Sequence, residues 1–486
     1  MFPSRPTLQL HLARLALAIG GAVPVAVIAV PAAAAAEAGA RPGSFSPAVA
    51  EAVTGTMPED FLPQLKPLLV SAMDRSPLAL GPLFEIELKQ FARMRADASR
   101  LPSLGGNFNY GTTQTSTSTD SSSRSRDNGF FYNFGLNQAV YHWGALKNES
   151  AIARINELLA AKSYEKAYRD IAVLVRTLYL ELVLRKARVR LARANVEAAN
   201  EVLKITRERV ARGAAPAAEV ASDELKVRAA DLELGRAESD FTTVRRSLER
   251  IAGAGPIDAE AIPAELPKPA ASGSLATALT AEVLRDGAKG TIEAQMHDLR
   301  IREALLRYEV EKVRLLPKFG LGAGYSLENN TNVNGNFVEQ RAVARQSVSI
   351  GAGWTIFDGF TTRAQKLEAK ANERLHTLRR KLELEELQDK AQELERTVKL
   401  DAVQFDLADI QRANAVESRR VTAQEAGFGK VAKSDVDRAE LVVLQAEARL
   451  VESRAAYFRN WSQLVAISGH DPALKNLPVR HAREKK

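Results

Sequence analysis

The chain has 486 residues, a modest formal net charge of +8 and no cysteine. The missing cysteines exclude a disulfide framework, thiolate metal sites, a cysteine nucleophile and an acylated N-terminal cysteine. Basic and acidic residues are interleaved along the predicted helices, which is typical of solvated helix faces. Nucleic-acid binding needs clustered positive charge, so the composition predicts no nucleic-acid partner.

Residues 1–36 have the composition of a secretory signal peptide. Arg5 and Arg14 precede an apolar run over residues 15–30, and a proline and several alanines follow, which suits a small-residue cleavage site. A single membrane anchor is the alternative, but the apolar run is short for a spanning helix. We therefore expect an exported protein with a flexible leader, rich in Ala, Pro, Gly and Ser, over residues 37–60.

The sequence repeats itself at a distance of 216 residues, so that Gly213 aligns with Gly429 and Val140 with Ile356. A repeat of this length indicates one body built from two copies of a unit. The predicted segments are the first repeat, residues 61–253, an inter-repeat linker, residues 254–276, the second repeat, residues 277–469, and a basic C-terminal tail, residues 470–486.

Each repeat is expected to begin with a helical segment that a Leu-Pro pair ends, at Leu101-Pro102 and at Leu316-Pro317. The second of these helices is expected over residues 277–315. A much longer helical pattern follows in each repeat and is broken by glycine-containing turns at residues 212–216 and 427–429. At 1.5 Å per residue, the helix before the first turn is roughly 100 Å long. Its apolar residues recur at spacings of three and four, which predicts coiled-coil-like packing.

A pair of strands is predicted between the helices of each repeat, because apolar residues alternate there with small or polar ones. In residues 319–328, for example, Phe319, Leu321 and Tyr325 alternate with glycine and serine. Polar loops are expected to join the two strands of each pair, over residues 112–127 in the first repeat. Each strand is about 10 residues long, which suffices to cross an outer membrane when the strand is tilted.

Open sheet edges are not tolerated in lipid, so these four strands must become part of a closed barrel. A barrel needs about eight strands or more, and it must therefore be shared between chains. Two chains would supply eight strands, and three would supply 12. Aromatic residues on the apolar strand faces suit the membrane interface. These residues are Tyr110, Tyr132, Tyr325 and Trp354.

Taken together, these features resemble the TolC family of outer-membrane efflux proteins over about residues 60–470. The resemblance implies a mainly α fold with a β-barrel membrane part. Long antiparallel helical hairpins would form a trimeric α-barrel, and four strands per chain would form a shared 12-stranded β-barrel. The motifs that carry the resemblance are the two Leu-Pro pairs, the joint Ile356-Phe357-Asp358-Gly359, and the turns in which Gly213 precedes Glu219-Val220 and Gly429 precedes Asp435-Val436.

The resemblance also implies a function. It implies a homotrimeric channel in the cell outer membrane, in contact with outer-membrane lipid, with a periplasmic helical domain. The channel would export substrates together with a periplasmic adaptor protein and an inner-membrane pump of the RND or ABC type. We expect no enzyme activity, catalytic residue, cofactor or metal site, since no carboxylate pair or histidine cluster has a recognisable spacing. An exported coiled-coil scaffold without channel activity is the alternative.

The candidate functional residues lie near the two turns. In the family, acidic residues there narrow the closed entrance, and Asp435 stands where one is expected. Arg438 occupies a position that is acidic in the best-known members, so the gate is either an acidic ring or an Asp–Arg pair. Asp435 could instead simply favour the helix start through the helix dipole. The gate candidates are Asp435, Asp437, Arg438 and Glu219, and the adaptor-contact candidates are Gly213, Ala214, Gly429 and Lys430.

Overall fold

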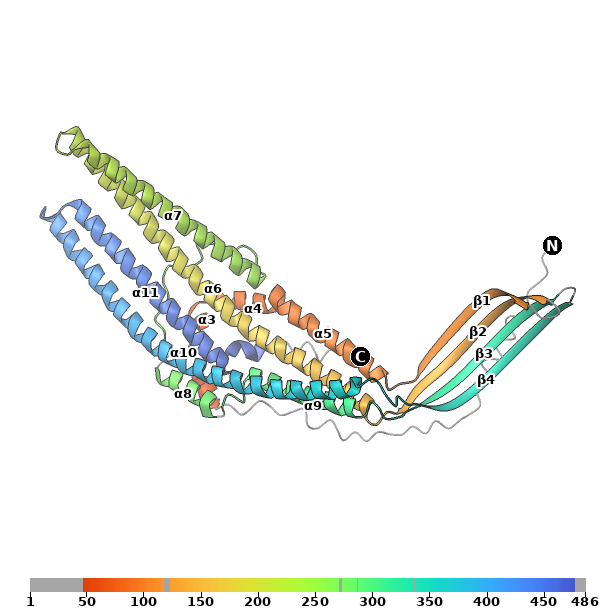
Figure 1. The fold of residues 1–486 in the computed structure, drawn as a ribbon. Coiled ribbons are helices and arrows are strands. Elements are labelled where there is room, and N and C mark those ends of the chain that lie inside the picture. Colours follow the sequence, from red (N-terminus) through yellow and green to blue (C-terminus); the bar gives the residue numbers. More distant parts are fainter. Residues whose placement is uncertain (1–46, 118–122, 271–272, 286, 335–336, 477–486) are drawn as a thin grey trace. The chain divides into compact units, whose positions relative to one another are not determined.

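The computed structural model describes residues 47–117, 123–270, 273–285, 287–334 and 337–476. The predicted signal peptide, the start of the leader and most of the basic tail lie outside these residues. Most described residues are helical, and the strands form one sheet (Figure 1). The helices are α2 (Pro47–Val53), α3 (Pro58–Phe61), α4 (Leu65–Arg75), α5 (Pro77–Ala98), α6 (Ala145–Ala211), α7 (Ala217–Ala252), α8 (Gly273–Arg285), α9 (Ile292–Lys312), α10 (Thr361–Gly427) and α11 (Lys433–Ile467), followed by the 3₁₀ helix η1 (Pro472–Asn476). The strands are β1 (Ser103–Thr117), β2 (Ser123–Tyr141), β3 (Lys318–Asn334) and β4 (Phe337–Gly353).

Helices α6 and α10 are equivalent elements of 67 residues each. Their starts, Ala145 and Thr361, lie 216 positions apart, in agreement with the repeat in the sequence. Each helix is followed by a glycine with positive φ, Gly213 at 71° and Gly429 at 72°. Residues with a side chain rarely adopt this conformation, so glycine permits the tight reversal into α7 and α11.

The long helices pack side by side in one layer. In the part that ends at the turns, the order is α7, α6, α11, α10 (Figure 1). In the part that leads to the strands, the order is α5, α6, α9, α10. Helix α10 therefore lies at one edge of the layer along its whole length, while α5 and α7 share the other edge.

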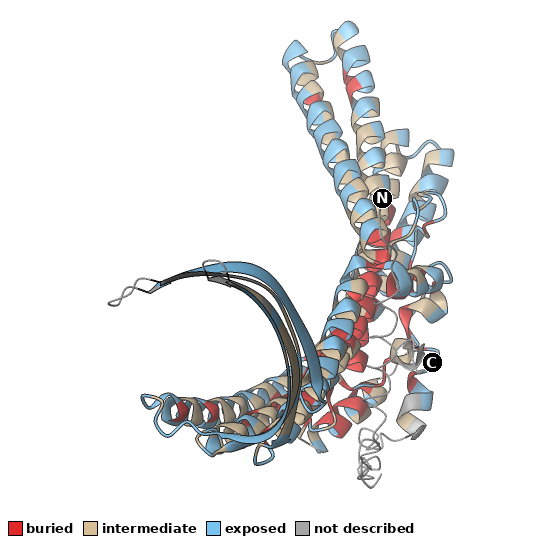
Figure 2. Cartoon of the chain, turned by 90° about the vertical axis from the view of Figure 1, so that its right-hand side faces the viewer, coloured by how far each residue is buried: buried red, intermediate tan, exposed pale blue. Residues whose placement is uncertain are grey.

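The largest buried core lies where short segments pack against the middle of α6 and the C-terminal half of α11 (Figure 2). Trp461 of α11 is fully buried, and its indole Nε1 donates a hydrogen bond to Thr56 Oγ1 at 3.1 Å. The Tyr179 hydroxyl of α6 donates to Gln64 Oε1 at 2.8 Å. We call these short segments the belt, which comprises residues 47–75, 254–270, 273–285 and 468–476.

A buried arginine fastens the two ends of the described chain to α6. The Arg176 side chain is fully buried and donates two hydrogen bonds to Glu59 and two to Asp471, the shortest of each at 2.6 Å. Burial alone would lower the pKa of Arg176, but the charges and hydrogen bonds of both carboxylates outweigh it and the pKa is raised. Next to this cluster, His470 contacts Glu282 of α8 at 2.5 Å.

The prediction of a flexible leader over residues 37–60 was wrong for its described part. Helices α2 and α3 occupy this stretch, and Val53 and Met57 are fully buried in the core. A few apolar side chains that find a neighbouring surface can order a segment that shows no helical period.

The helix expected over residues 277–315 is two helices. Helix α8 begins at Gly273, inside the predicted linker, and α9 begins only at Ile292. Gly287 and Ala288 between them have φ values of 59° and 58°, which no helix can contain. Thr291 caps the new helix, because its side chain accepts a hydrogen bond from the Ala294 backbone N–H.

Candidate functional site: sheet, subunit edges and turns

The four strands form an antiparallel sheet in the order β1-β2-β3-β4. They are 15, 19, 17 and 17 residues long and continue through the polar segments that were predicted to be loops. The predicted strand length of about 10 residues was thus too short, because a ladder of backbone hydrogen bonds does not require apolar side chains. The extra length suits strands that project beyond a lipid layer.

The register of the strands separates two faces of the sheet. Phe108 is paired with Tyr132, and Phe134 with Tyr325, so the apolar residues of neighbouring strands share one face. The other face carries glycine, serine and asparagine. Pairs on that face are Asn107 with Asn133, Gly135 with Gly324 and Gly322 with Ser349. The sheet is curved, and none of its described side chains is buried (Figure 2).

Aromatic rings cover the apolar face. The rings of Phe108 and Phe134 lie 5.6 Å apart edge to face, and those of Phe130 and Tyr132 lie 5.7 Å apart. Tyr110, on the same face, is 75% exposed. An exposed aromatic surface of this kind is unusual in water and is typical of a surface that contacts lipid or a partner.

The fourth predicted interface aromatic, Trp354, lies just beyond the end of β4. Its indole Nε1 donates a hydrogen bond to the backbone carbonyl of Leu315 at 2.9 Å, while 62% of the residue stays exposed. Trp143 donates in the same way to Pro317 at 2.7 Å. Sequence reasoning did not single out Trp143. Both indoles sit where a strand meets a helix, a position that suits the boundary of a membrane.

Both edges of the chain carry exposed apolar residues at helical spacing. On one edge, α5 has Phe84, Leu88, Phe91 and Met94, and α7 has Leu225 and Leu232. On the other edge, α10 has Leu375, Leu378 and Leu382 in one part and Leu400, Val403, Leu407 and Ile410 in the other. Sequence reasoning did not name these residues. Their spacing of three and four could have indicated such an edge. The same spacing occurs on helix faces that are buried within one chain, so it could not tell the two apart.

The first turn joins α6 to α7. The Ala214 N–H donates to the Arg209 carbonyl at 2.8 Å, and the Gly213 N–H donates to the Val210 carbonyl at 2.9 Å. These two bonds satisfy carbonyls at the end of α6. Glu219, the gate candidate here, lies in the first turn of α7, with its carboxylate 3.8 Å from the Arg209 guanidinium.

The second turn joins α10 to α11 and repeats this geometry. The Lys430 N–H donates to the Glu425 carbonyl at 3.0 Å, as Ala214 does at the first turn. All four adaptor-contact candidates are exposed. Phe428 is 78% exposed between two glycines at the tip, and sequence reasoning did not select it.

Asp435 and Arg438 are brought together within one chain. The Arg438 guanidinium donates to Asp435 Oδ1 at 3.0 Å, and Asp435 Oδ2 accepts from the Ala432 backbone N–H at 3.2 Å. Asp435 therefore stabilises the start of α11 as well. Asp437 is partly exposed, and within the part of the chain that the structure describes it forms no ion pair.

Just above the first turn, a buried carboxylate joins the two helices. The Thr206 hydroxyl of α6 donates to Asp223 of α7 at 2.8 Å, and Lys226 donates to the same carboxylate at 2.8 Å. The hydrogen bonds from Lys226 and Thr206 lower the pKa of Asp223.

The model of the outer membrane efflux protein family matches residues 83–254 and 294–470, well over half of the chain. The chain belongs to the outer membrane efflux protein family. It is therefore an outer-membrane protein of efflux, and the scaffold alternative is not supported.

Solved channels share this fold. The Campylobacter jejuni outer membrane channel CmeC is 14% identical, with a TM-score of 0.66 over 85% of this chain and 87% of that chain. The Vibrio cholerae outer membrane protein VceC is 15% identical, with a TM-score of 0.63 over 85% and 98%. The open state of the Neisseria gonorrhoeae outer membrane channel MtrE is 15% identical, with a TM-score of 0.60 over 84% and 89%. No curated protein matches the chain significantly.

Among the described residues, no helix is long and apolar enough to cross a membrane.

Proposed function

We propose that three copies of this chain form one passive duct that crosses the outer membrane and extends through the periplasm. Substrates would enter at the turns and leave through the sheet region. The duct would break no covalent bond and use no cofactor, because transport needs only an aqueous path and a gate. The predicted signal peptide, residues 1–36, would direct the chain out of the cytoplasm.

The observation that carries this proposal is that the sheet and the helical layer both end at the same two edges of the chain, and that these edges have no partner there. Strands β1 and β4 each lack a partner on one side within the described sheet. Helices α5 and α7 follow the β1 edge in the order of packing, and α10 follows the β4 edge. A head-to-tail interface between these edges would pair the free edges of β1 and β4 and bury the apolar edges of the helices at the same time. Such an interface can close into a ring.

Three copies would give a 12-stranded barrel with its apolar face toward lipid. Two copies would give eight strands, whose interior is filled by side chains. The polar face of this sheet carries glycines such as Gly135 and Gly351, where no atom lies within 4 Å of an added Cβ. The ring of three therefore fits a channel better than the ring of two.

The turns would receive a periplasmic adaptor, which connects the duct to an inner-membrane pump of the RND or ABC type. Gly213, Ala214, Gly429 and Lys430 support this role by their exposure at the ends of both hairpins. Phe428, exposed on the second turn, adds an apolar contact of the kind that protein interfaces favour.

The gate would lie at the same end. Asp435, Asp437 and Arg438 at the second turn and Glu219 at the first turn would narrow the closed entrance of the ring. The pair of Asp435 and Arg438 lies within α11 of one chain. Opening would be a small change in the twist of the hairpins. If both Asp435→Ala and Asp435→Asn keep the single-channel conductance and the opening frequency of the wild type, the proposed gating role of Asp435 is wrong.

The decisive experiment is the mass of the mature protein purified from outer membranes in mild detergent. We expect a complex of three chains that resists extraction of the membranes with carbonate or urea and that conducts ions in a planar bilayer. A protein that washes off with carbonate, or that remains a monomer or dimer without conductance, would contradict the duct.

A further inference from the structure

The belt covers one face of the helical layer. Lys186 of α6 donates to the Ile262 carbonyl at 2.7 Å, and Arg454 of α11 donates to the Leu266 carbonyl at 2.5 Å. Lys268 of the belt reaches across to Asp406 of α10 at 2.9 Å. Since the belt lies on α6, α10 and α11 from the same side, the opposite face is the one left to line the lumen of the proposed duct.

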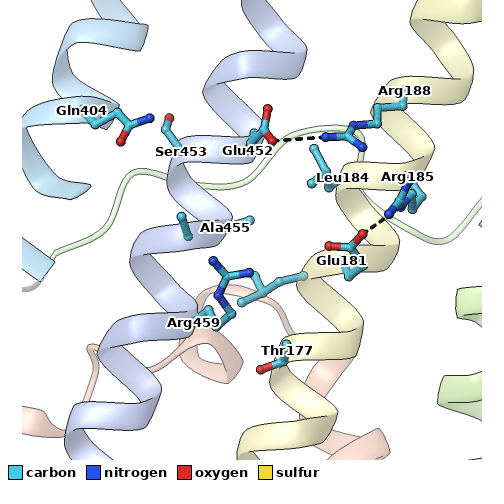
Figure 3. A pocket seen from close by; sticks show the side chains of 12 residues that line it. Thr177, Glu181, Leu184, Arg185, Arg188, Gln404, Glu452, Ser453, Ala455 and Arg459 are labelled. Carbon is cyan, nitrogen blue, oxygen red and sulfur yellow. Dashed lines mark hydrogen bonds and ion pairs between the residues drawn. The ribbon is translucent and has the colours of Figure 1, made fainter. Parts of the chain in front are cut away.

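A polar cleft of about 360 Å³ lies between α6 and α11 on this opposite face (Figure 3). Successive residues of an α-helix are turned by about 100° around its axis. Arg459 is two positions before Trp461, so it points to the opposite side of α11 from Trp461, which is buried against the belt. Glu181 and Arg188 are related to the belt-facing Tyr179 in the same way. Thr177, Gln404 and Glu452 also line the cleft.

Most of the charges in the cleft neutralise one another. Arg185 pairs with Glu181 at 2.7 Å and also with Asp240 of α7 at 2.7 Å. Arg188 pairs with Glu452 at 3.1 Å, which bridges α6 and α11. These ion pairs account for every carboxylate that lines the cleft.

Arg459 is the exception. Its side chain is exposed, and within the described chain it takes part in no ion pair. Its charge does act on Asp401, but that carboxylate is buried and accepts a hydrogen bond from Asn460 at 2.7 Å. The guanidinium donors of Arg459 thus remain available to a solute.

We infer that Arg459 forms a contact site for carboxylate-bearing anions on the wall of the duct, so that the ring of three sites makes the duct prefer anions over cations. This inference rests on the proposed trimeric duct. A guanidinium binds a carboxylate through two parallel hydrogen bonds, while water and chloride compete less well for that geometry.

The test is the reversal potential of the purified trimer in a planar bilayer under gradients of potassium chloride and potassium acetate. Low ionic strength is used because the Debye length reaches about 30 Å at 0.01 M. We expect Arg459→Gln to lower the ratio of anion to cation permeability by about twofold or more, with a larger effect for acetate than for chloride. Arg459→Lys should keep most of the preference for chloride and lose part of that for acetate.

Lys268→Gln is the matched control, because it removes one exposed positive charge from the belt side at the same level of the helices. It should leave both permeability ratios as in the wild type. Equal ratios for the wild type and Arg459→Gln would overturn the inference, and so would an equal shift in Lys268→Gln. If the wild type does not conduct at all, the proposed duct itself fails, which is a different result.

Discussion

The buried pair of Arg169 in α6 and Glu293 in α9 shows how a single charge can hold two helices together. Two hydrogen bonds join the groups, at 2.7 and 3.3 Å. Burial alone would raise the pKa of Glu293, but the hydrogen bonds and the charge of Arg169 outweigh it, so the pKa is lowered below 4.5. The ionised carboxylate is therefore favoured by the folded state.

We predict that Glu293→Gln destabilises the protein by about 3 kcal/mol at pH 7, because Arg169 stays buried without its main counter-charge. Because the pKa of Glu293 is lowered in the folded state, the extra unfolding free energy of the wild type over the variant is complete above pH 4.5. It is lost as the pH falls through the folded-state pKa. Thermal unfolding followed by circular dichroism at several pH values measures this difference. Glu417→Gln, in an exposed pair with Arg420, should have little effect. If Glu293→Gln lowers the unfolding free energy by the same amount at pH 7 and pH 3, the ionised Glu293 does not stabilise the protein through Arg169.

A second prediction concerns Arg176, whose guanidinium holds both Glu59 and Asp471. Arg176→Ala should cost about 3–5 kcal/mol, since it leaves two carboxylates without their partner. Arg176→Lys should restore only part of this, because an ammonium group cannot form two bidentate contacts. Limited proteolysis should then cut first within residues 47–75 or 468–476. Cleavage that begins at the hairpin turns instead would show that the cluster does not hold the belt.

At the scale of elements, the two turns depend on glycine for their backbone and not for space. Gly429 has a φ of 72°, and no atom lies within 4 Å of an added Cβ. Gly429→Ala should therefore destabilise the end of the hairpin by about 1 kcal/mol. The matched control is Gly235→Ala in the middle of α7, where φ is helical and the site is equally open. This change should stabilise by about 0.5–1 kcal/mol. Hydrogen exchange of the tip amides would show faster exchange only for Gly429→Ala, and unchanged tips would refute the prediction.

The same elements show what the sequence could predict. The long helices and the turns were predictable, because each carries many periodic residues and a glycine of fixed role. The extra strand length was not, since the polar ends of β1 to β4 pair through backbone groups alone. Helices α2 and α3 were missed because a few residues such as Met57 are ordered by surfaces distant in sequence.

For the candidate site, sequence reasoning found the position of the turns but not the partners within them. The spacing of Asp435 and Arg438 left open whether they pair, and the structure joins them at 3.0 Å. Arg459 was not selected at all. Its significance depends on which face the belt covers, and no local pattern in α11 contains that information.

At the scale of the whole molecule, the apolar edge of α10 is the feature that a single chain leaves incomplete. Leu407 is 54% exposed there, in a row of apolar residues at spacings of three and four. In the proposed ring this row packs against α7 of the next copy. We predict that Leu407→Glu weakens the trimer while each chain still folds, because the side chain contacts little within its own chain. Mass measurement in detergent across a range of protein concentrations would show dissociation at higher concentrations than for the wild type.

Leu158→Glu provides the control for this prediction. Leu158 is 44% exposed, but it lies on α6, which has neighbours from its own chain on both sides. It cannot reach a seam between copies, so its variant should remain trimeric at wild-type concentrations. Since the chain has no cysteine, pairs of introduced cysteines on α7 and α10 can test the same seam by cross-linking between copies. If Leu407→Glu remains fully trimeric, or if both variants lose the trimer equally, the copies do not meet along α10.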